Sequence, residues 1–377
     1  ALAVPTANRP WRRGEYPRHA GISSFGFSGT NAHLVLEEAP AQTFAPALER
    51  PAHLLTLSAK QEQALEALAG RYADHLAAHP GAALAELCAT ANRGRAHFNH
   101  RLAIRAGSPE ALRDRLAAAA AGETPEGVQR GTLARNVGTP HVAFLFTAER
   151  VPEAGSGHDL YRTEPRFRDV MDRCASVLEE HLDLPLLEVL WGRHTDRLDE
   201  TRYSQPATFA LEIALASLWQ AWGVEPAVVG GEGVGELAAA CVAGALKMEE
   251  ALVLVAARAR LSPRDSGEAA ARVAWQPLKR PLLSTRTGSI TPAGTQLSTA
   301  PWTARAQEPG PRDESLNALA REGIGIALEI GPHPFRLSEA GTADEESLLR
   351  LPSLVPGRGA WPTMMDTLGA LYTRGLE

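Results

Sequence analysis

A glycine-dense turn near the middle of the chain most restricts what the chain can fold into. The β-branched pair Val228-Val229 leads into Gly231-Glu232-Gly233-Val234-Gly235, and an alanine-rich stretch from Leu237 to Gly244 follows. β-branched residues favour a strand and alanine favours a helix, so the pattern predicts a strand–turn–helix corner. A Gly-x-Ser-x-Gly elbow of this kind presents a reactive serine above a sheet. Here the central position is Gly233, so the predicted corner lacks a nucleophile.

Length and composition indicate a globular protein of more than one domain. The chain has 377 residues, of which 44% are hydrophobic and 22% are charged, and this suffices for two or three domains with their own cores. The net charge of -6 argues against nucleic acid or an anionic membrane as a partner. The longest apolar candidate, Leu237 to Ala257, is interrupted by Lys247, Glu249 and Glu250, so no membrane span is expected.

The cysteines give no sign of a disulfide framework or a metal site. Cys88, Cys174 and Cys241 are odd in number and widely scattered, so each is expected to be a reduced thiol on a buried helix face. The first residues carry proline and arginine and no apolar segment that would form a signal peptide. We therefore expect a piece of a longer cytoplasmic polypeptide.

A small α/β unit of strand, helix, helix, strand and helix is predicted before residue 121. Ser58 with Gln61 three residues later is typical of a capping box that opens a helix. His97 to Ala106 alternates as a half-buried strand does. Ser108-Pro109 is typical of a helix start, because proline at the first helical position has no N–H to leave unsatisfied.

The turn and its surroundings resemble the acyltransferase domains of modular polyketide synthases. Those domains carry Gly-His-Ser-x-Gly at the elbow, and here residues 198–207 before the turn and 255–258 after it keep the resemblance. Matched position by position, Glu232 stands where the family has histidine, and Gly233 stands where it has the acylated serine. Arg258 matches the arginine that pairs with the free carboxylate of a malonyl or methylmalonyl group, to which a planar guanidinium makes a bidentate contact.

Two further parts of the family's site are changed. After a strand at Val142 to Thr147, Glu149 takes the place of a glutamine that helps to form the oxyanion hole, and a carboxylate cannot donate a hydrogen bond to an oxyanion. The family's ferredoxin-like subdomain and its catalytic histidine should follow Leu261, but the chain moves almost directly to later segments. His333 matches the family's late Gly-Pro-His-Pro turn, not its base.

The resemblance extends along most of the chain and implies an α/β fold. Residues 20–39 read as a hairpin that is similar to the end of a ketosynthase, and Arg93 to Phe98 resembles the ketosynthase-to-acyltransferase linker. The implied fold is a small α/β linker domain plus a truncated α/β-hydrolase-like acyltransferase core that lacks the ferredoxin-like subdomain. The implied domains are a ketosynthase tail at 1–39, the linker domain at 40–140, a degenerate acyltransferase-like domain at 141–340 and the start of the post-acyltransferase linker at 341–377.

With these substitutions, the resemblance implies a catalytically inactive acyltransferase remnant. Acyl transfer needs a nucleophile, a base within hydrogen-bond reach and donors aimed at the oxyanion. The vestigial positions are Glu149, Glu232, Gly233 and Arg258, and no cofactor or metal site is expected. On this interpretation the chain is not an enzyme by its own residues, although the parent synthase is a transferase.

The expected role is that of a structural adaptor in a cytoplasmic polyketide megasynthase. The chain would keep the ketosynthase and downstream domains, including the acyl carrier protein, correctly spaced. It would also offer a surface to an acyltransferase acting in trans. Neither nucleic acid nor a membrane is an expected partner.

Two alternatives remain open. In the first, the chain is an active acyl-CoA or acyl carrier protein transferase with altered catalytic residues, and Arg258 still binds an acyl-CoA carboxylate instead of pairing with Glu232 or another acid. In the second, the glycine turn is a dinucleotide site with Glu250 as the ribose-binding acid. The spacing Gly231-x-Gly233-x-Gly235 differs from Gly-x-Gly-x-x-Gly, and no second strand leads to the acid.

Overall fold

The computed structural model describes residues 4–40, 50–134, 138–146, 151–260, 273–297, 312–334 and 348–376. The chain forms two compact units, Ala1–Leu48 and Glu49–Glu377. Among their described residues, none of the helices is both long and apolar enough to cross a membrane. Each unit is described by itself.

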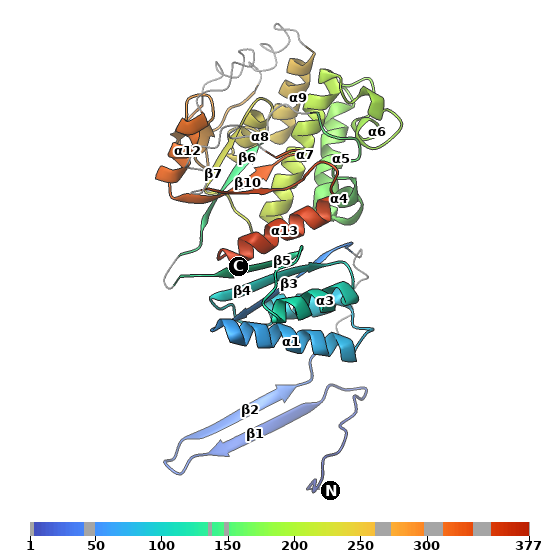
Figure 1. The fold of residues 1–377 in the computed structure, drawn as a ribbon, viewed down its shortest axis with the longest axis vertical. Helices are drawn as coiled ribbons and strands as arrows, with labels where there is room; N and C mark the ends of the chain where they lie inside the picture. Colours follow the sequence, from blue (N-terminus) through green and yellow to red (C-terminus); the bar gives the residue numbers. More distant parts are fainter. Residues whose placement is uncertain are drawn as a thin grey trace. The chain divides into compact units, whose positions relative to one another are not determined.

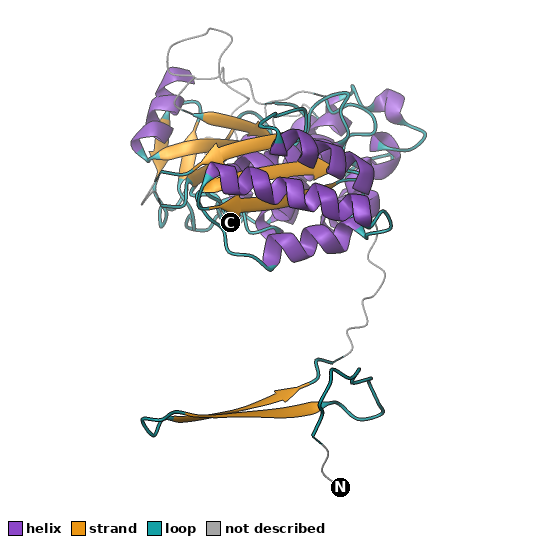
Figure 2. Cartoon of the chain, turned by 60° about the horizontal axis from the view of Figure 1, so that its bottom comes forward, coloured by secondary structure: helices purple, strands orange, loops and turns teal. Residues whose placement is uncertain are grey.

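The first unit is the predicted hairpin. Strands β1 (His19–Phe25) and β2 (Asn31–Glu37) pair antiparallel with Ile22 opposite Leu34, and the described part of this unit contains strands and loops without a helix (Figure 2). Large apolar side chains are exposed along both strands. At the open end of the hairpin, Glu38 accepts hydrogen bonds from Arg18, which holds the strand ends together.

The second unit contains a small antiparallel sheet in the order β3-β4-β5. Its strands are β3 (His53–Ala59), β4 (His100–Ala106) and β5 (Val128–Thr132). Helices α1 (Glu62–Ala78), α2 (Leu84–Arg93) and α3 (Pro109–Ala120) bury their apolar faces against it. Helix α13 (Ala360–Thr373), from the end of the chain, lies along the same sheet (Figure 1).

The start of α3 is confirmed and the capping box at Ser58 is wrong. Ser108 Oγ accepts a hydrogen bond from the Ala111 N–H, as an N-cap does. Ser58 instead lies within β3, and its hydroxyl bonds the backbone of Ala96 and Phe98. Pairing with β4 carries the strand through Ser58, so α1 begins only at Glu62. The strand predicted to start at His97 begins three residues later, at β4.

A large sheet in the order β11-β10-β6-β7-β8-β9 forms the rest of the second unit. Every neighbouring pair is parallel except the last, β8–β9. The strands are β6 (His141–Phe146), β7 (Val228–Gly231), β8 (Leu282–Ser284), β9 (Ser289–Thr291), β10 (Ile324–Ile330) and β11 (Leu349–Pro352).

Helices cover both faces of the large sheet, as a parallel sheet requires. They are α4 (His158–Thr163), α5 (Pro165–Leu178), α6 (Leu186–Leu190), the 3₁₀ helix Thr195–Arg197, α7 (Thr201–Ala221), α8 (Gly235–Val242), α9 (Met248–Ala259) and α12 (Arg312–Arg321). Alternation along β6 separates two cores: Val142 and Phe144 pack in the cluster that contains α5 and α7, whereas Ala143 and Leu145 pack in the cluster that contains α12.

The α/β fold class is therefore confirmed. The chain passes from the end of α9 at Ala259 to the start of β8 at Leu282, and this interval is too short for a ferredoxin-like subdomain. The strand predicted after residue 141 and the strand–turn–helix corner are both present, as β6 and as β7 with α8.

Candidate functional site

The corner between β7 and α8 lies at the carboxyl end of the large sheet. Gly231 pairs with Phe146 of β6 on one side and with Ser284 of β8 on the other. A Cβ on Gly231 would collide with the carbonyl group of Gly235 and lie 2.9 Å from the backbone nitrogen of Glu236. The strand end and the first helical turn therefore cross too closely for any residue but glycine.

Gly233 occupies the tip of this corner. Its φ is +60°, in the left-handed region that favours glycine. In a nucleophile elbow this position carries the reactive side chain on a strained backbone. Here the backbone shape is kept, but the position offers no hydroxyl.

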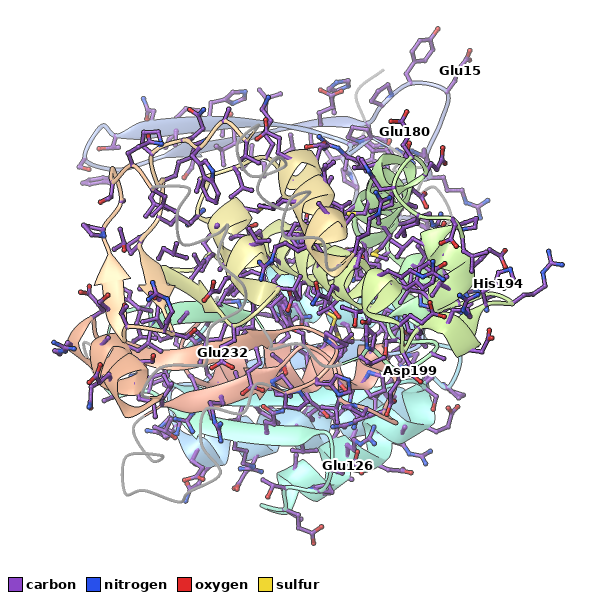
Figure 3. All side chains as sticks on the ribbon, turned by 90° about the horizontal axis from the view of Figure 1, so that it is seen from above. Glu15, Glu126, Glu180, His194, Asp199 and Glu232 are labelled. Atoms are coloured by element: carbon purple, nitrogen blue, oxygen red, sulfur yellow. The ribbon has the colours of Figure 1, made fainter. Side chains whose placement is uncertain are left out.

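Charged side chains gather around the corner. Glu236, in the first turn of α8, is half-buried. Burial is the largest influence and raises its pKa; the guanidinium groups of Arg258 on α9 and Arg286 after β8 act in the opposite direction, and the nearby Glu232 adds to the rise. Glu232 is labelled in Figure 3.

Arg258, Arg286 and Glu232 thus all lie near enough to Glu236 to change its pKa. Arg258 is near enough to lower the pKa of the Glu236 carboxyl. The expectation that Arg258 pairs with an acid instead of an acyl-CoA carboxylate stays a prediction. Glu149 lies outside the described residues.

Glu236 and Arg286 are the site residues that sequence reasoning missed. Glu236 directly follows the glycine turn, so its place in the first helical turn was an available signal. Arg286 had no such signal, because only the pairing of β7 with β8 brings it to the corner.

His333 lies in the loop after β10. Its Nε2–H donates to the carbonyl oxygen of Val151 at 2.7 Å, so this nitrogen is held by the loop that follows β6. Its Nδ1 is buried, with no hydrogen-bond partner in the described part of the chain. In the Gly-Pro-His-Pro turn, His333 therefore makes a structural contact with the backbone.

The dinucleotide alternative is wrong. Glu250 lies in the first turn of α9. A ribose-binding acid should instead stand at the end of a second strand of a βαβ unit. The glycine turn leads from β7 to α8 and on to α9, with no such strand between them.

Cysteines and metal ligands give no second site. Cys88 and Cys174 are buried and Cys241 is half-buried, all as free thiols. Within the described ranges, no three histidine, cysteine or carboxylate side chains are grouped closely enough to hold a metal ion.

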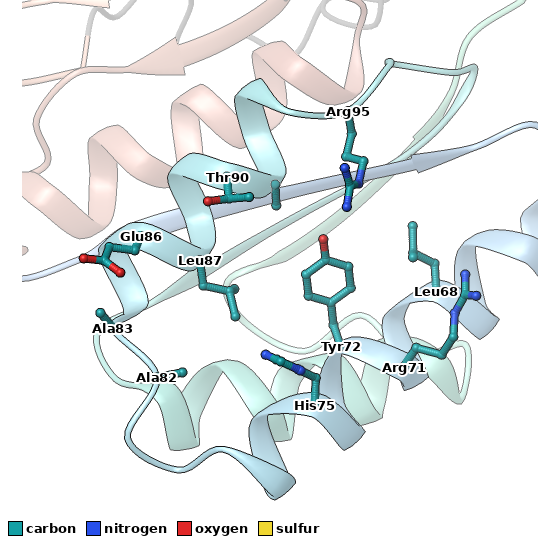
Figure 4. A pocket seen from close by; sticks show the side chains of 11 residues that line it. Leu68, Arg71, Tyr72, His75, Ala82, Ala83, Glu86, Leu87, Thr90 and Arg95 are labelled. Carbon is teal, nitrogen blue, oxygen red and sulfur yellow. The ribbon is translucent and has the colours of Figure 1, made fainter. Parts of the chain in front are cut away.

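A groove of about 580 Å³ lies between α1 and α2. Leu68, Leu87 and Ala91 are among its apolar lining, and Tyr72 extends into it toward Arg95 (Figure 4).

Comparison with known families assigns both parts of the second unit. The model of the acyl transferase domain matches residues 143–277, which include the β7–α8 corner, and the model of the CurL-like polyketide synthase C-terminal region matches residues 53–116. The chain carries an acyltransferase domain of the modular polyketide synthase family. The resemblance read from the sequence is therefore confirmed, although these matches say nothing of a degenerate state.

Two relatives agree with this assignment. The chain is 39% identical over 268 residues to a type I phenolphthiocerol synthesis polyketide synthase of Mycobacterium marinum, covering 69% of this chain and 12% of the relative. It is 40% identical over 278 residues to an erythronolide synthase of Saccharopolyspora erythraea, covering 71% of this chain and 8% of the relative. The chain thus spans only a small part of these relatives.

The fold is similar to that of a solved acyltransferase domain. The domain from module 8 of the salinomycin polyketide synthase superposes with a TM-score of 0.75 at 23% identity, over 87% of this chain and 97% of that one. At this identity the likeness supports the fold alone.

The expectation that the chain is not an enzyme is wrong. The acyl transferase model matches across the substituted corner, and the relatives are synthases, so the domain is classed with transferases. The expectation depended on the residue types at Glu232 and Gly233, whereas the match extends over residues 143–277, where β7, the close crossing at Gly231 and α8 are all in place.

Proposed function

We propose that this acyltransferase domain acts as a structural adaptor in a modular polyketide synthase. It would keep a ketosynthase and an acyl carrier protein at a fixed spacing in a cytoplasmic assembly, with a trans-acting acyltransferase as a further candidate partner. The observation that carries the proposal is α13, which is bonded both to the small sheet and to the large one.

Contacts with the small sheet come from the middle and the carboxyl end of α13. The Arg101 guanidinium, which is buried, donates to the Tyr372 carbonyl oxygen at 3.0 Å. Arg105 pairs with the Asp366 carboxylate at 2.8 Å. Gln129 donates to the backbone carbonyl of Asp366 at 2.7 Å. The two bonds from arginine guanidinium groups each contribute about 1.5–3 kcal/mol, and the neutral bond from Gln129 contributes about 0.5–1.5 kcal/mol, so α13 is firmly attached to β4 and β5.

Contacts with the large sheet and its helices begin at the amino end of α13. Asp159 in α4 accepts a hydrogen bond from the Ala360 N–H at 3.0 Å and so caps the helix. The Trp361 side chain is fully buried, and its indole N–H donates to Thr163 at 2.8 Å. Thr367 donates to the carbonyl oxygen of Pro352 at 2.6 Å.

Arg50 makes a second connection at the start of β3. Its guanidinium lies over the rings of Trp361 and Trp222, at 5.1 and 5.8 Å from their centroids, and it pairs with the buried Glu164 at 2.6 Å. Such cation–π contacts each contribute about 0.5–2 kcal/mol. Both connections join parts of one compact unit.

The domain boundaries belong to the same proposal. A ketosynthase tail at 1–39 would precede the linker domain at 40–140, and the acyltransferase domain at 141–340 would precede the linker at 341–377. Helix α13, in the last segment, packs back onto the linker domain. In this proposal, α13 therefore connects the linker domain to the acyltransferase domain within the second unit.

The test measures polyketide extension in a module that contains this chain and is supplied with pre-acylated carrier protein. A variant that detaches α13, such as Trp361→Ala, should lower turnover, because loading is bypassed and only domain spacing is altered. Gly81→Ala, at a glycine with open space around it, is the control. Full turnover with a detached α13 would refute the adaptor role.

A second candidate function is acyl transfer through residues other than position 233. Glu236 favours it, because a half-buried carboxyl of raised pKa can serve as a general base, and Arg258 lies near it. Incubation with radiolabelled malonyl-CoA tests this second function. Stoichiometric covalent labelling would support acyl transfer by this chain, and absence of label would count against Glu236 and Arg258 as its catalytic groups.

A further inference from the structure

A cavity of about 220 Å³, lined by polar side chains and by Leu282, Leu283 and Leu297, lies on the β8 side of the corner. Gly231 and Glu236 line it from the corner, and Ser284, Arg286 and Thr287 line it from the end of β8. At about 30 Å³ per water molecule, its volume corresponds to roughly seven waters. It can therefore hold a small polyatomic ion together with some of its hydration.

The end of β8 is fixed against the corner. Thr285 is buried, and its hydroxyl donates to the Gly231 carbonyl oxygen at 2.9 Å. Gly288, with a φ of +64°, closes the turn between β8 and β9, and Ser284 pairs with Ser289 across it. The residues that line the cavity thus come from a tight hairpin attached to β7.

Every polar side chain that this hairpin contributes to the lining can donate a hydrogen bond. The guanidinium of Arg286 carries five N–H donors in a planar fork and no acceptor. The hydroxyls of Thr287 and Ser289 lie 2.6 Å apart, so one of them donates to the other, and the second keeps a free hydrogen. Ser284 adds a third hydroxyl. We infer that this cavity binds a tetrahedral oxyanion of the phosphate class, with Arg286 as its cationic ligand and the hairpin hydroxyls as neutral donors.

A tetrahedral oxyanion fits this set better than a planar carboxylate does. Four oxygens directed to different sides can accept bonds from a guanidinium on one side and from hydroxyls on the others, whereas the two oxygens of a carboxylate lie in one plane and are both engaged by a bidentate guanidinium contact. The hydroxyls, spread over β8 and β9, are the part of the site that a carboxylate would leave unused.

Glu236 lines the cavity and opposes an anion there, and the carboxylate of Glu314 on α12, which lies against Gly288 of the hairpin, is a second opposing group. Burial raises the pKa of Glu236, Arg258 on α9 and Arg286 on the hairpin lower it, and Glu232 in the turn raises it. When Glu236 is protonated, its carboxyl carries no charge that would repel an oxyanion, and its O–H can donate a hydrogen bond to the ion. Binding should therefore weaken as the pH rises through the raised pKa of Glu236.

The test titrates the whole chain with sulfate by isothermal calorimetry at constant ionic strength. Sulfate keeps its charge between about pH 5 and 8, whereas a phosphate monoester changes its charge near pH 6. Arg286→Gln should weaken binding at least about tenfold, as loss of a charge-assisted contact implies. Arg321 lies on α12, where its Nε–H donates to the Asn317 carbonyl oxygen of the same helix; Arg321→Gln is the matched control and should bind as the unchanged protein does.

Glu236→Gln supplies an independent arm. This variant keeps the shape of the side chain and removes its charge, so sulfate affinity should become independent of pH and exceed that of the unchanged protein at high pH. Equal affinity in the two arginine variants would overturn the site. So would an unchanged pH dependence in Glu236→Gln, or acetate binding as tightly as sulfate.

Discussion

The contact between α13 and β5 can be tested at a single glycine. A Cβ added to Gly131 would lie 3.0 Å from the carbonyl carbon and from the Cβ of Thr373, and nearer still to its carbonyl oxygen. These atoms belong mainly to the helix backbone, which cannot rotate away as a long side chain can. Gly131→Ala should therefore push the end of α13 off the small sheet.

The expected cost follows from that overlap. Insertion of one methyl group into a well-packed contact costs about 1–3 kcal/mol. The adjacent bond from Arg101 to the Tyr372 carbonyl oxygen would be stretched by the same movement, so we expect a value in the upper half of that range. For a large domain, each 1 kcal/mol lowers the melting temperature by roughly 2–4 °C, which predicts a fall of roughly 4–12 °C.

Thermal unfolding followed by circular dichroism measures this shift. Gly81→Ala is the matched control, because nothing lies within 4 Å of its added Cβ. That control should be neutral or stabilising by about 0.4–1 kcal/mol, since alanine reduces the freedom of the unfolded chain. Equal melting temperatures for the two variants would show that α13 does not lie against β5 as described.

Three further predictions concern buried groups. Burial raises the pKa of Glu236 above the value in the unfolded chain. The stabilising contribution of Glu236 is therefore present at low pH and is lost as the pH rises through the raised pKa. Glu236→Gln should remove this pH-dependent loss of stability, measured by urea denaturation. Burial raises the pKa of Cys88 and Cys174 to about 12; mass spectrometry should therefore find both thiols unmodified by iodoacetamide at about pH 8 until the protein is unfolded. Ser353→Ala removes the acceptor of the buried Trp219 indole N–H and should cost about 1–3 kcal/mol in the same denaturation.

Local signals predicted the local elements. The glycine turn at Gly231 to Gly235 and the cap at Ser108 depend on residues within a few positions of each other, and both are present in the structure. Ser58 failed for the opposite reason. Its neighbours favoured a helix start, but pairing with Arg101 on β4 keeps it in a strand, and no local pattern contains that partner.

The site was less predictable than the fold. The sequence resemblance identified Gly233 and Glu232 because the family has its reactive serine and a histidine at those two positions. Arg286 was missed because it is not near the turn in sequence and reaches it only through the parallel pairing of Gly231 with Ser284. Long-range sheet register, unlike turn chemistry, cannot be read from one sequence.

The acyltransferase fold and acyl-transfer chemistry depend on different atoms of the same corner. The fold needs Gly231, because β7 and α8 cross there without room for a Cβ. Position 233 must adopt a positive φ, which costs a residue with a side chain about 1–3 kcal/mol and costs glycine far less. Only a reacting hydroxyl would justify a serine there. Glycine at that position therefore relaxes the turn while it preserves the crossing, the sheet behind it and the packing of α13, and these are the features on which an adaptor depends.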